Sequence, residues 1–228
     1  EPFREYIANK DPKKIAINFS KTSVLADGLT YGMHQILLEH LEGTDYKNRF
    51  VSSEEIISAL RGRKSPAELA LMKEAVKETL KIFDEVTKYM KPGMTEIDIA
   101  KHVKKVYTER GFETGWEEDH CPAVFAGPNP NGPHEGPSDK VIKAGTVVNM
   151  DFGIKYKGYC SDLQRTWYIL KDGETKAPAA VQKGFDVIRD SIQKVADAVK
   201  PGVKGVDMDT IARSYITQNG YPEYIHGL

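Results

Sequence analysis

Apolar and polar side chains alternate along the chain from Val147 to Ile154. An alternation with a period of two is typical of a strand with one buried face. The expected buried face carries Val148, Met150, Phe152 and Ile154, and the expected open face carries Asn149, Asp151 and Gly153. Gly158 indicates a turn, and residues 159–170 are expected to return as the partner strand.

Two aspartates lie on either side of this expected turn. With a two-residue tip at 156–157, Asp151 would pair directly with Asp162, their Cβ atoms roughly 5 Å apart. Two ionised carboxylates at that separation repel each other, so one holds a proton unless a cation lies between them. The pair therefore indicates either a metal site or a carboxylate dyad. A three-residue tip that includes Gly158 would slip the register by one and place the acids on opposite faces, unless a bulge restored it. The alternative to a functional pair is two solvated surface acids.

Helical spacing of apolar residues predicts a long helix that begins near residue 65. The apolar positions that follow this spacing are Leu69, Met72, Val76, Leu80, Phe83 and Val86. Ser65 and Glu68 predict a capping box at its start. Ser52 and Glu55 predict a second capping box, at a short helix that precedes it. Nearer the start of the chain, residues 14–19 are expected as a strand and residues 31–41 as a helix.

A segment of the chain recurs 109 residues later. Lys91-Pro92-Gly93 reappears as Lys200-Pro201-Gly202, and Gly111 reappears as Gly220. Each copy is a long helix, a turn and a second helix, so the chain is expected to contain an internal duplication. The first copy continues into a strand-rich segment, but the second stops at Leu228. A half-built sheet would leave an open edge, so we expect the chain to be part of a longer protein.

Composition limits the classes of function that fit this chain. It has 228 residues and a net charge of −1, so nothing in its charge favours nucleic acid or an anionic membrane. No apolar run approaches the roughly 20 residues of a membrane span. The two cysteines are too few for a disulfide framework. A cytoplasmic protein is expected, although a leader before the first residue would point to export.

A loop rich in glycine and proline precedes the alternating strand. Residues 126–137 read AGPNPNGPHEGP, a composition incompatible with a regular helix or an interior strand. The loop carries His134, which on such a loop could donate a hydrogen bond, move a proton or bind a metal. His226 lies three residues from the end of the chain and carries no signal by itself.

Taken together, these residues resemble the metallopeptidases of the pita-bread fold. The resemblance rests on GPH at His134, DFG at Asp151, SDLQRT at Asp162, and a final HGL at His226. That family includes methionine aminopeptidases, prolidases, Xaa-Pro aminopeptidases and creatinase. The KSPAEL helix start and the α/β segment before it resemble the prolidase and Xaa-Pro aminopeptidase branch. Residues 50–228 carry the resemblance well, and residues 1–50 carry it loosely.

The resemblance implies an α+β fold with two regions. Residues 1–50 would be the remnant of an N-terminal α/β domain of the creatinase type. Residues 51–228 would be an incomplete pita-bread catalytic domain, with duplicated helical halves around a curved antiparallel sheet. The second half would lack its strands.

The resemblance also implies roles for individual residues. Asp151 and Asp162 would be the first two ligands of a site for two divalent ions, either manganese, cobalt or zinc. His134 and His226 would be catalytic residues on the substrate side. Arg165 would lie beside the site, as would Thr166, its neighbour in the sequence. The substrate would be a peptide with proline at its second position, cleaved by water that the two ions activate.

The sequence departs from the family pattern at its end. The remaining ligands of the family, a second histidine and two glutamates, would all follow Leu228. Two carboxylates alone rarely hold a transition metal tightly. We therefore expect this chain alone to bind metal weakly and to hydrolyse little, and the complete protein to be the enzyme.

Other functions remain open from the sequence. Within the same family, the chain could be related to methionine aminopeptidases, to creatinase, or to members that have lost catalysis and serve as binding modules. Retention of both aspartates favours the peptidases. An unrelated α+β domain would have to produce the repeat and the motif spacing by chance. The expected partner is a peptide, with neither nucleic acid nor membrane, and a homodimer is compatible with the sequence.

Overall fold

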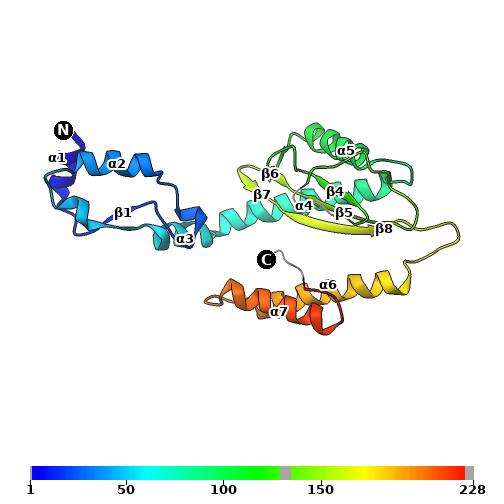
Figure 1. Cartoon of the computed structure of the whole chain (residues 1–228). Helices are drawn as coiled ribbons and strands as arrows, with labels where there is room; N and C mark the ends of the chain where they lie inside the picture. The colour runs from blue at the N-terminus through cyan, green and yellow to red at the C-terminus, as the bar shows by residue number, and fades with distance from the viewer. Residues whose placement is uncertain (1, 129–134, 224–228) are drawn as a thin grey trace. The chain divides into compact units, whose positions relative to one another are not determined.

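The computed structural model describes residues 2–128 and 135–223 and divides the chain into two compact units (Figure 1). These units are Glu1–Leu71 and Met72–Leu228. The domain boundary expected between residues 50 and 51 stays a prediction. Residues 50–52 form a strand that is paired within the first unit. That pairing keeps residues 50–52 with the first unit because its partner strand lies there.

The first unit is built around two short parallel strands. Its elements are α1 (Pro2–Lys10), β1 (Ile15–Ile17), η1 (Val24–Ala26), α2 (Tyr31–His40), η2 (Tyr46–Arg49), β2 (Phe50–Ser52) and α3 (Glu54–Gly62). β1 pairs with β2 in parallel, and α2 lies between them in the chain. The expected strand at 14–19 and helix at 31–41 are therefore confirmed. Whether this unit is the remnant of a larger α/β domain stays a prediction.

One of the two predicted capping boxes is wrong. α3 begins after Ser53, whose side chain makes no capping bond. Ser52 is instead the last residue of β2, and its hydroxyl donates to the carbonyl oxygen of Phe19 at 2.5 Å. Pairing with β1 holds Ser52 in extended backbone one position too early to cap the helix.

The second unit contains four helices and six strands within the described residues. They are α4 (Pro66–Tyr89, which begins before the boundary), α5 (Glu96–Glu109), β3 (Glu113–Thr114), β4 (Ala123–Ala126), β5 (Val147–Phe152), β6 (Ile154–Tyr156), β7 (Tyr159–Cys160), β8 (Leu163–Tyr168), α6 (Ala179–Ala198) and α7 (Gly205–Gln218). The capping box at the start of α4 is confirmed. The Ser65 amide donates to Glu68 Oε2 at 2.6 Å, and the Glu68 amide donates to Ser65 Oγ at 3.3 Å.

The helix boundaries confirm the internal repeat. Adding 109 to the bounds of α5, Glu96–Glu109, gives the bounds of α7, Gly205–Gln218. The turn glycines agree as well, because Gly93 and Gly202 both have φ of +93°. α6 and α7 lie side by side as a helical hairpin (Figure 1). The repeat is thus present in the backbone conformation as well as in the amino-acid sequence.

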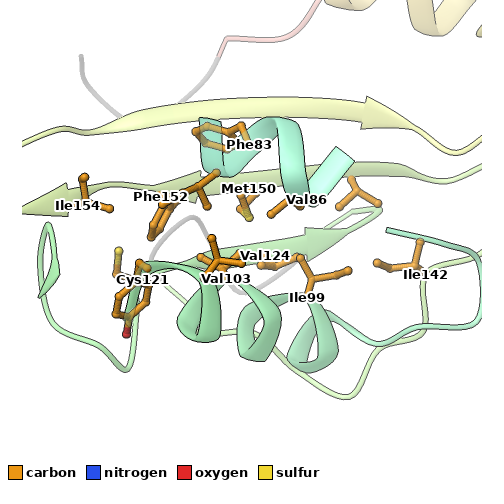
Figure 2. Packing of buried hydrophobic residues seen from close by; sticks show 14 of the residues in the cluster. Phe83, Val86, Ile99, Val103, Cys121, Val124, Ile142, Met150, Phe152 and Ile154 are labelled. Carbon is orange, nitrogen blue, oxygen red and sulfur yellow. The ribbon is translucent and has the colours of Figure 1, made fainter. Parts of the chain in front are cut away.

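The strands of the second unit form two antiparallel sheets, and the chain passes from one sheet to the other and back. One sheet has the order β4-β5-β8 and the other has the order β3-β6-β7. The alternation predicted for β5 is confirmed, since Val148, Met150 and Phe152 are fully buried. Figure 2 shows Met150 and Phe152 packed with Phe83 and Val86 of α4, and with residues of α5. Val148 belongs to the same core. Helices α4 and α5 therefore cover one face of the sheet, and the Asp151 face lies opposite.

The predicted register of the hairpin is wrong by two residues. The turn is made by Lys157 and Gly158, with φ of +48° and +88°, and Asp151 pairs with Gln164. A two-residue hairpin turn of this hand needs positive φ at both positions, and glycine adopts it at no steric cost. Asp162 consequently lies in the two-residue link between β7 and β8, not opposite Asp151.

In the part of the chain that the structure describes, no helix combines the length and the apolar character needed to cross a membrane.

Candidate functional site

Both aspartates line one cavity of about 590 Å³ at the junction of the two sheets. The wall comes from the end of β5, the link between β7 and β8, and the connection between β3 and β4. Its residues are Gly115, Trp116, Glu117, His120, Ala123, Asp151, Cys160, Ser161 and Asp162. The two acids thus reach a common space although the pairing proposed for them does not exist.

Asp151 is held by strands on both sides. It lies on the central strand β5, opposite Ala123 of β4 and Gln164 of β8. The side-chain amide of Gln164 donates to Asp151 Oδ2 at 3.0 Å. The residue is half-buried, and its Oδ1 is out of contact with solvent. A carboxylate on the middle strand of a sheet has little freedom to move, which suits a fixed ligand.

Asp162 is exposed and lies outside the strand ladders. Its position is set by the preceding residue, Ser161, which is only 2% exposed. The chain at Ser161 crosses directly over Gly153, where an added Cβ would lie 1.8 Å from the Ser161 carbonyl oxygen. Glycine at 153 is therefore required for the link to pass between the two sheets.

The described residues fit one part of a metal centre. Carboxylate oxygens are suitable ligands for hard divalent ions, and two of them line the same cavity. Within residues 2–128 and 135–223, no three His, Cys, Asp or Glu side chains come close enough together to hold a metal. A complete site would need further ligands in addition to Asp151 and Asp162.

The structure separates the remaining predicted site residues. Thr166 lies on the Asp151 face of β8, and its hydroxyl accepts from Asn149 Nδ2 at 3.1 Å. Arg165 lies on the opposite face, with its guanidinium 5.4 Å from the ring centre of Phe83. Strand alternation explains the difference, since neighbours on a strand point to opposite faces. His134 and His226 lie outside the described residues, and their roles stay predictions.

The short connection 115–122 contributes a wall that the sequence patterns did not indicate. Trp116 packs against the core, and its indole N–H donates to the carbonyl oxygen of His120 at 2.9 Å. Trp116, Glu117 and His120 all line the cavity. No periodicity marks this connection, so only the folded chain brings it to the aspartates.

A buried glutamate holds both ends of the loop that carries His134. Glu96, the first residue of α5, is only 4% exposed. Its carboxylate accepts from the Ala126 amide at 2.7 Å, before the loop, and from the Ser138 amide at 2.9 Å and hydroxyl at 2.6 Å, after it. The repeat has Gly205 at the equivalent position, so this clamp belongs to the first copy alone.

Replacing Glu96 by Gln should weaken this clamp. The amide turns one acceptor into a donor that faces other donors, so we expect a loss of about 2 kcal/mol in the free energy of unfolding. Urea titration of the complete protein would measure it. Glu109→Gln, at the exposed far end of α5, is the matched control and should change stability by less than about 0.5 kcal/mol. Equal effects of the two substitutions would contradict the clamp.

The two free thiols should differ in reactivity. Burial raises the pKa of Cys121 to about 11, whereas Cys160 is exposed on β7. At pH 8 only about one Cys121 side chain in a thousand would be the reactive thiolate. Iodoacetamide should therefore label Cys160 in the native protein and Cys121 only after unfolding. Mass spectrometry of the labelled peptides would show it, and native labelling of Cys121 at the same rate would contradict its burial.

Comparison with known proteins shows the family of this chain. The model of the metallopeptidase family M24 matches residues 70–228, more than half of the chain. The chain belongs to metallopeptidase family M24. That match includes most of α4, both sheets and the cavity with its two aspartates. The α+β pita-bread fold expected from the sequence is thereby confirmed.

Curated and solved M24 proteins show the same likeness. An uncharacterized peptidase of Bacillus subtilis is 32% identical over an alignment of 186 residues, and the match covers 76% of this chain and 48% of that protein. A Xaa-Pro dipeptidase from Bacillus anthracis superposes with a TM-score of 0.75 at 25% identity, covering 99% of this chain and 58% of that one. A prolidase from Pyrococcus horikoshii superposes with a TM-score of 0.73 at 26% identity, covering 88% of this chain and 55% of that one. The M24 chain thus spans about half the length of the relatives it matches.

Proposed function

We propose that the complete protein is a metal-dependent exopeptidase that hydrolyses Xaa-Pro peptide bonds. The supporting observation is that Asp151 and Asp162 line one cavity in a chain of metallopeptidase family M24. The Xaa-Pro class is supported by the likeness to a Xaa-Pro dipeptidase and a prolidase, each at least 25% identical to this chain. The activity belongs to the complete protein, since this chain covers only part of its relatives.

In this proposal Asp151 and Asp162 hold two divalent ions, either manganese, cobalt or zinc. When bound, such ions polarise the scissile carbonyl and lower the pKa of water, which is the chemistry that peptide hydrolysis needs. Asp151 would supply the rigid side of the site, because it lies between two paired strands and accepts from Gln164. Asp162 would supply the exposed side that faces incoming substrate.

His134 and His226 are proposed to contact the substrate. A histidine that donates to the oxygen of the carbonyl under attack stabilises the charge that develops there, by roughly 3 kcal/mol. For His134, the clamp by Glu96 supports this role, because it fixes both ends of the loop on which His134 lies. For His226, the support is its place in the HGL sequence that resembles the family motif.

The size of the cavity is compatible with a short peptide. Pockets for small ligands usually measure about 300–1,000 Å³, and this one measures about 590 Å³. Trp116 offers an apolar wall, and Glu117 and His120 offer polar groups on the side of the β3–β4 connection. A peptide with proline at its second position is the proposed substrate. A net charge of −1 supports neither nucleic acid nor membrane as a partner.

Hydrolysis assays on the complete protein test the proposal. The protein is stripped with a chelator, and Mn²⁺, Co²⁺ or Zn²⁺ is added back before it is offered Ala-Pro, Ala-Ala or Met-Ala-Ser. We expect metal-dependent cleavage of Ala-Pro that exceeds cleavage of Ala-Ala by at least tenfold. Preferred cleavage after Met would indicate a methionine aminopeptidase instead, and hydrolysis that persists without metal would overturn the proposal.

A further inference from the structure

We propose that Thr79 and Ser161 are positioning residues that fix the direction of Asp162 toward its metal. The inference rests on the proposed function, since it assigns how one of the two proposed ligands is held. Asp162 itself lies in a two-residue link outside the strand ladders. Something other than sheet pairing must therefore hold its backbone in place.

A chain of buried hydrogen bonds runs from helix α4 to this link. Thr79 on α4 is fully buried, and Ser161, directly before Asp162, is 2% exposed. Their hydroxyl oxygens are 2.7 Å apart, although the residues are 82 positions apart in the chain. Thr79 Oγ1 also lies 2.9 Å from the carbonyl oxygen of Ala75, and Ser161 Oγ lies 2.9 Å from the amide nitrogen of Ile154.

The short contacts define one direction for the protons. The Ile154 amide can only donate, so Ser161 Oγ accepts from it. The carbonyl oxygen of Ala75 can only accept, so Thr79 donates to it. The remaining proton, on Ser161, is then directed to Thr79 Oγ1 at 2.7 Å, which is nearer than its other acceptor, the carbonyl oxygen of Ile154 at 3.3 Å. Every hydroxyl donates once and accepts once, and a buried network of this kind is rigid when each member is satisfied.

The main chain of Ser161 is held as tightly as its side chain. Its amide donates to the carbonyl oxygen of Ile154 at 2.9 Å. Its own carbonyl oxygen lies so close to Gly153 and Gly115 that a Cβ on either residue would come within 1.8 Å and 3.0 Å of it. Ser161 is therefore fixed on three sides, and the Cα of Asp162 follows it. Helix α4 supplies one of these contacts, the hydrogen bond between the hydroxyls of Thr79 and Ser161.

A second threonine on the same helix provides a matched control. Thr87 Oγ1 donates to the carbonyl oxygen of Phe83 at 2.8 Å and accepts from Trp167 Nε1 at 2.9 Å. It thus makes the same pair of bonds as Thr79, one within α4 and one to the strand side. Eight residues on a helix amount to about 12 Å, and Thr87 contacts a part of β8 remote from Asp162.

The experiment compares Thr79→Val and Thr87→Val in the complete protein. Manganese affinity is measured by isothermal titration calorimetry on metal-free protein, and the melting temperature of the metal-free protein is measured in parallel. We expect Thr79→Val to raise the Kd for Mn²⁺ by about 10-fold or more, the usual size for residues that orient a ligand. Thr87→Val should leave that Kd within threefold of the original, and it should lower the melting temperature less than Thr79→Val does, because Thr87 is exposed whereas Thr79 is fully buried.

Restoring the hydroxyl should restore the affinity. Thr79→Ser is expected to bind Mn²⁺ within threefold of the original protein, because it keeps both hydrogen bonds. If Thr79→Val yields no folded protein, Thr79→Cys is the second variant, since its thiol is a weaker donor of similar bulk, and it should shift the Kd in the same direction.

The outcomes separate this inference from the proposed function. An original protein that binds Mn²⁺ tightly, with Thr79→Val and Thr87→Val alike in affinity, overturns the inference alone. Weak binding by Thr79→Ser overturns it as well, because the hydroxyl would not be the group that matters. No Mn²⁺ binding by the unaltered protein overturns the proposed function, and the positioning role with it.

Discussion

Asp162→Asn should lower kcat/KM of the complete protein for a Xaa-Pro peptide by on the order of 10³-fold or more. A neutral amide is a poor substitute for a carboxylate at a divalent ion, and the expected rate depends on the water and the carbonyl that the ions activate. The free energy of unfolding should change by less than about 0.5 kcal/mol, because Asp162 is exposed and outside the strand ladders. Activity would thus be lost without loss of fold.

Two measurements make this result decisive. Steady-state hydrolysis of Ala-Pro at saturating Mn²⁺ gives the change in kcat/KM, and urea titration gives the change in stability. Asp172→Asn, at an exposed aspartate after β8 that does not line the cavity, is the matched control and should retain full activity. Turnover by Asp162→Asn at the original rate would reject Asp162 as a ligand.

Gly153→Ala should have the largest effect on stability, a loss of about 4 kcal/mol or more in the free energy of unfolding. The new Cβ would lie 1.8 Å from the carbonyl oxygen of Ser161 and 2.7 Å from its carbonyl carbon. Neither atom belongs to a flexible side chain, so the link between β7 and β8 would have to move. Effects of this size come from a short list of causes, and a backbone clash is one of them.

Gly158→Ala separates the clash from the ordinary cost of replacing a glycine. Gly158 has φ of +88°, but nothing lies within 4 Å of an added Cβ there. Its replacement should cost only about 1–2 kcal/mol, the strain of a left-handed backbone. Thermal or urea unfolding of the two variants would compare them, and similar losses at both positions would contradict the close crossing at Gly153. Ser161 makes the close contact with Gly153 and directly precedes Asp162. The Gly153→Ala protein that still folds should therefore also bind Mn²⁺ more weakly.

The sequence alone determined the features that arise from short-range pattern. The alternation of β5 placed Val148, Met150 and Phe152 in the core, because a strand turns each successive side chain to the other face. The repeat predicted the second pair of helices, and the bounds of α7 agree with those of α5 at an offset of 109. The capping box of Ser65 and Glu68 formed as expected, since both of its partners lie within one turn.

The tertiary structure decided how the two aspartates meet. The turn conformation of Lys157 and Gly158 sets the register, so Asp151 pairs with Gln164 and Asp162 lies in a link. Asp162 reaches the cavity through contacts of Ser161 with Gly153 and Thr79, one of them 82 residues away. Glu96 holds a loop 30 and 42 residues further along. Local patterns do not encode such contacts, because each depends on two distant segments that only the packed core brings together.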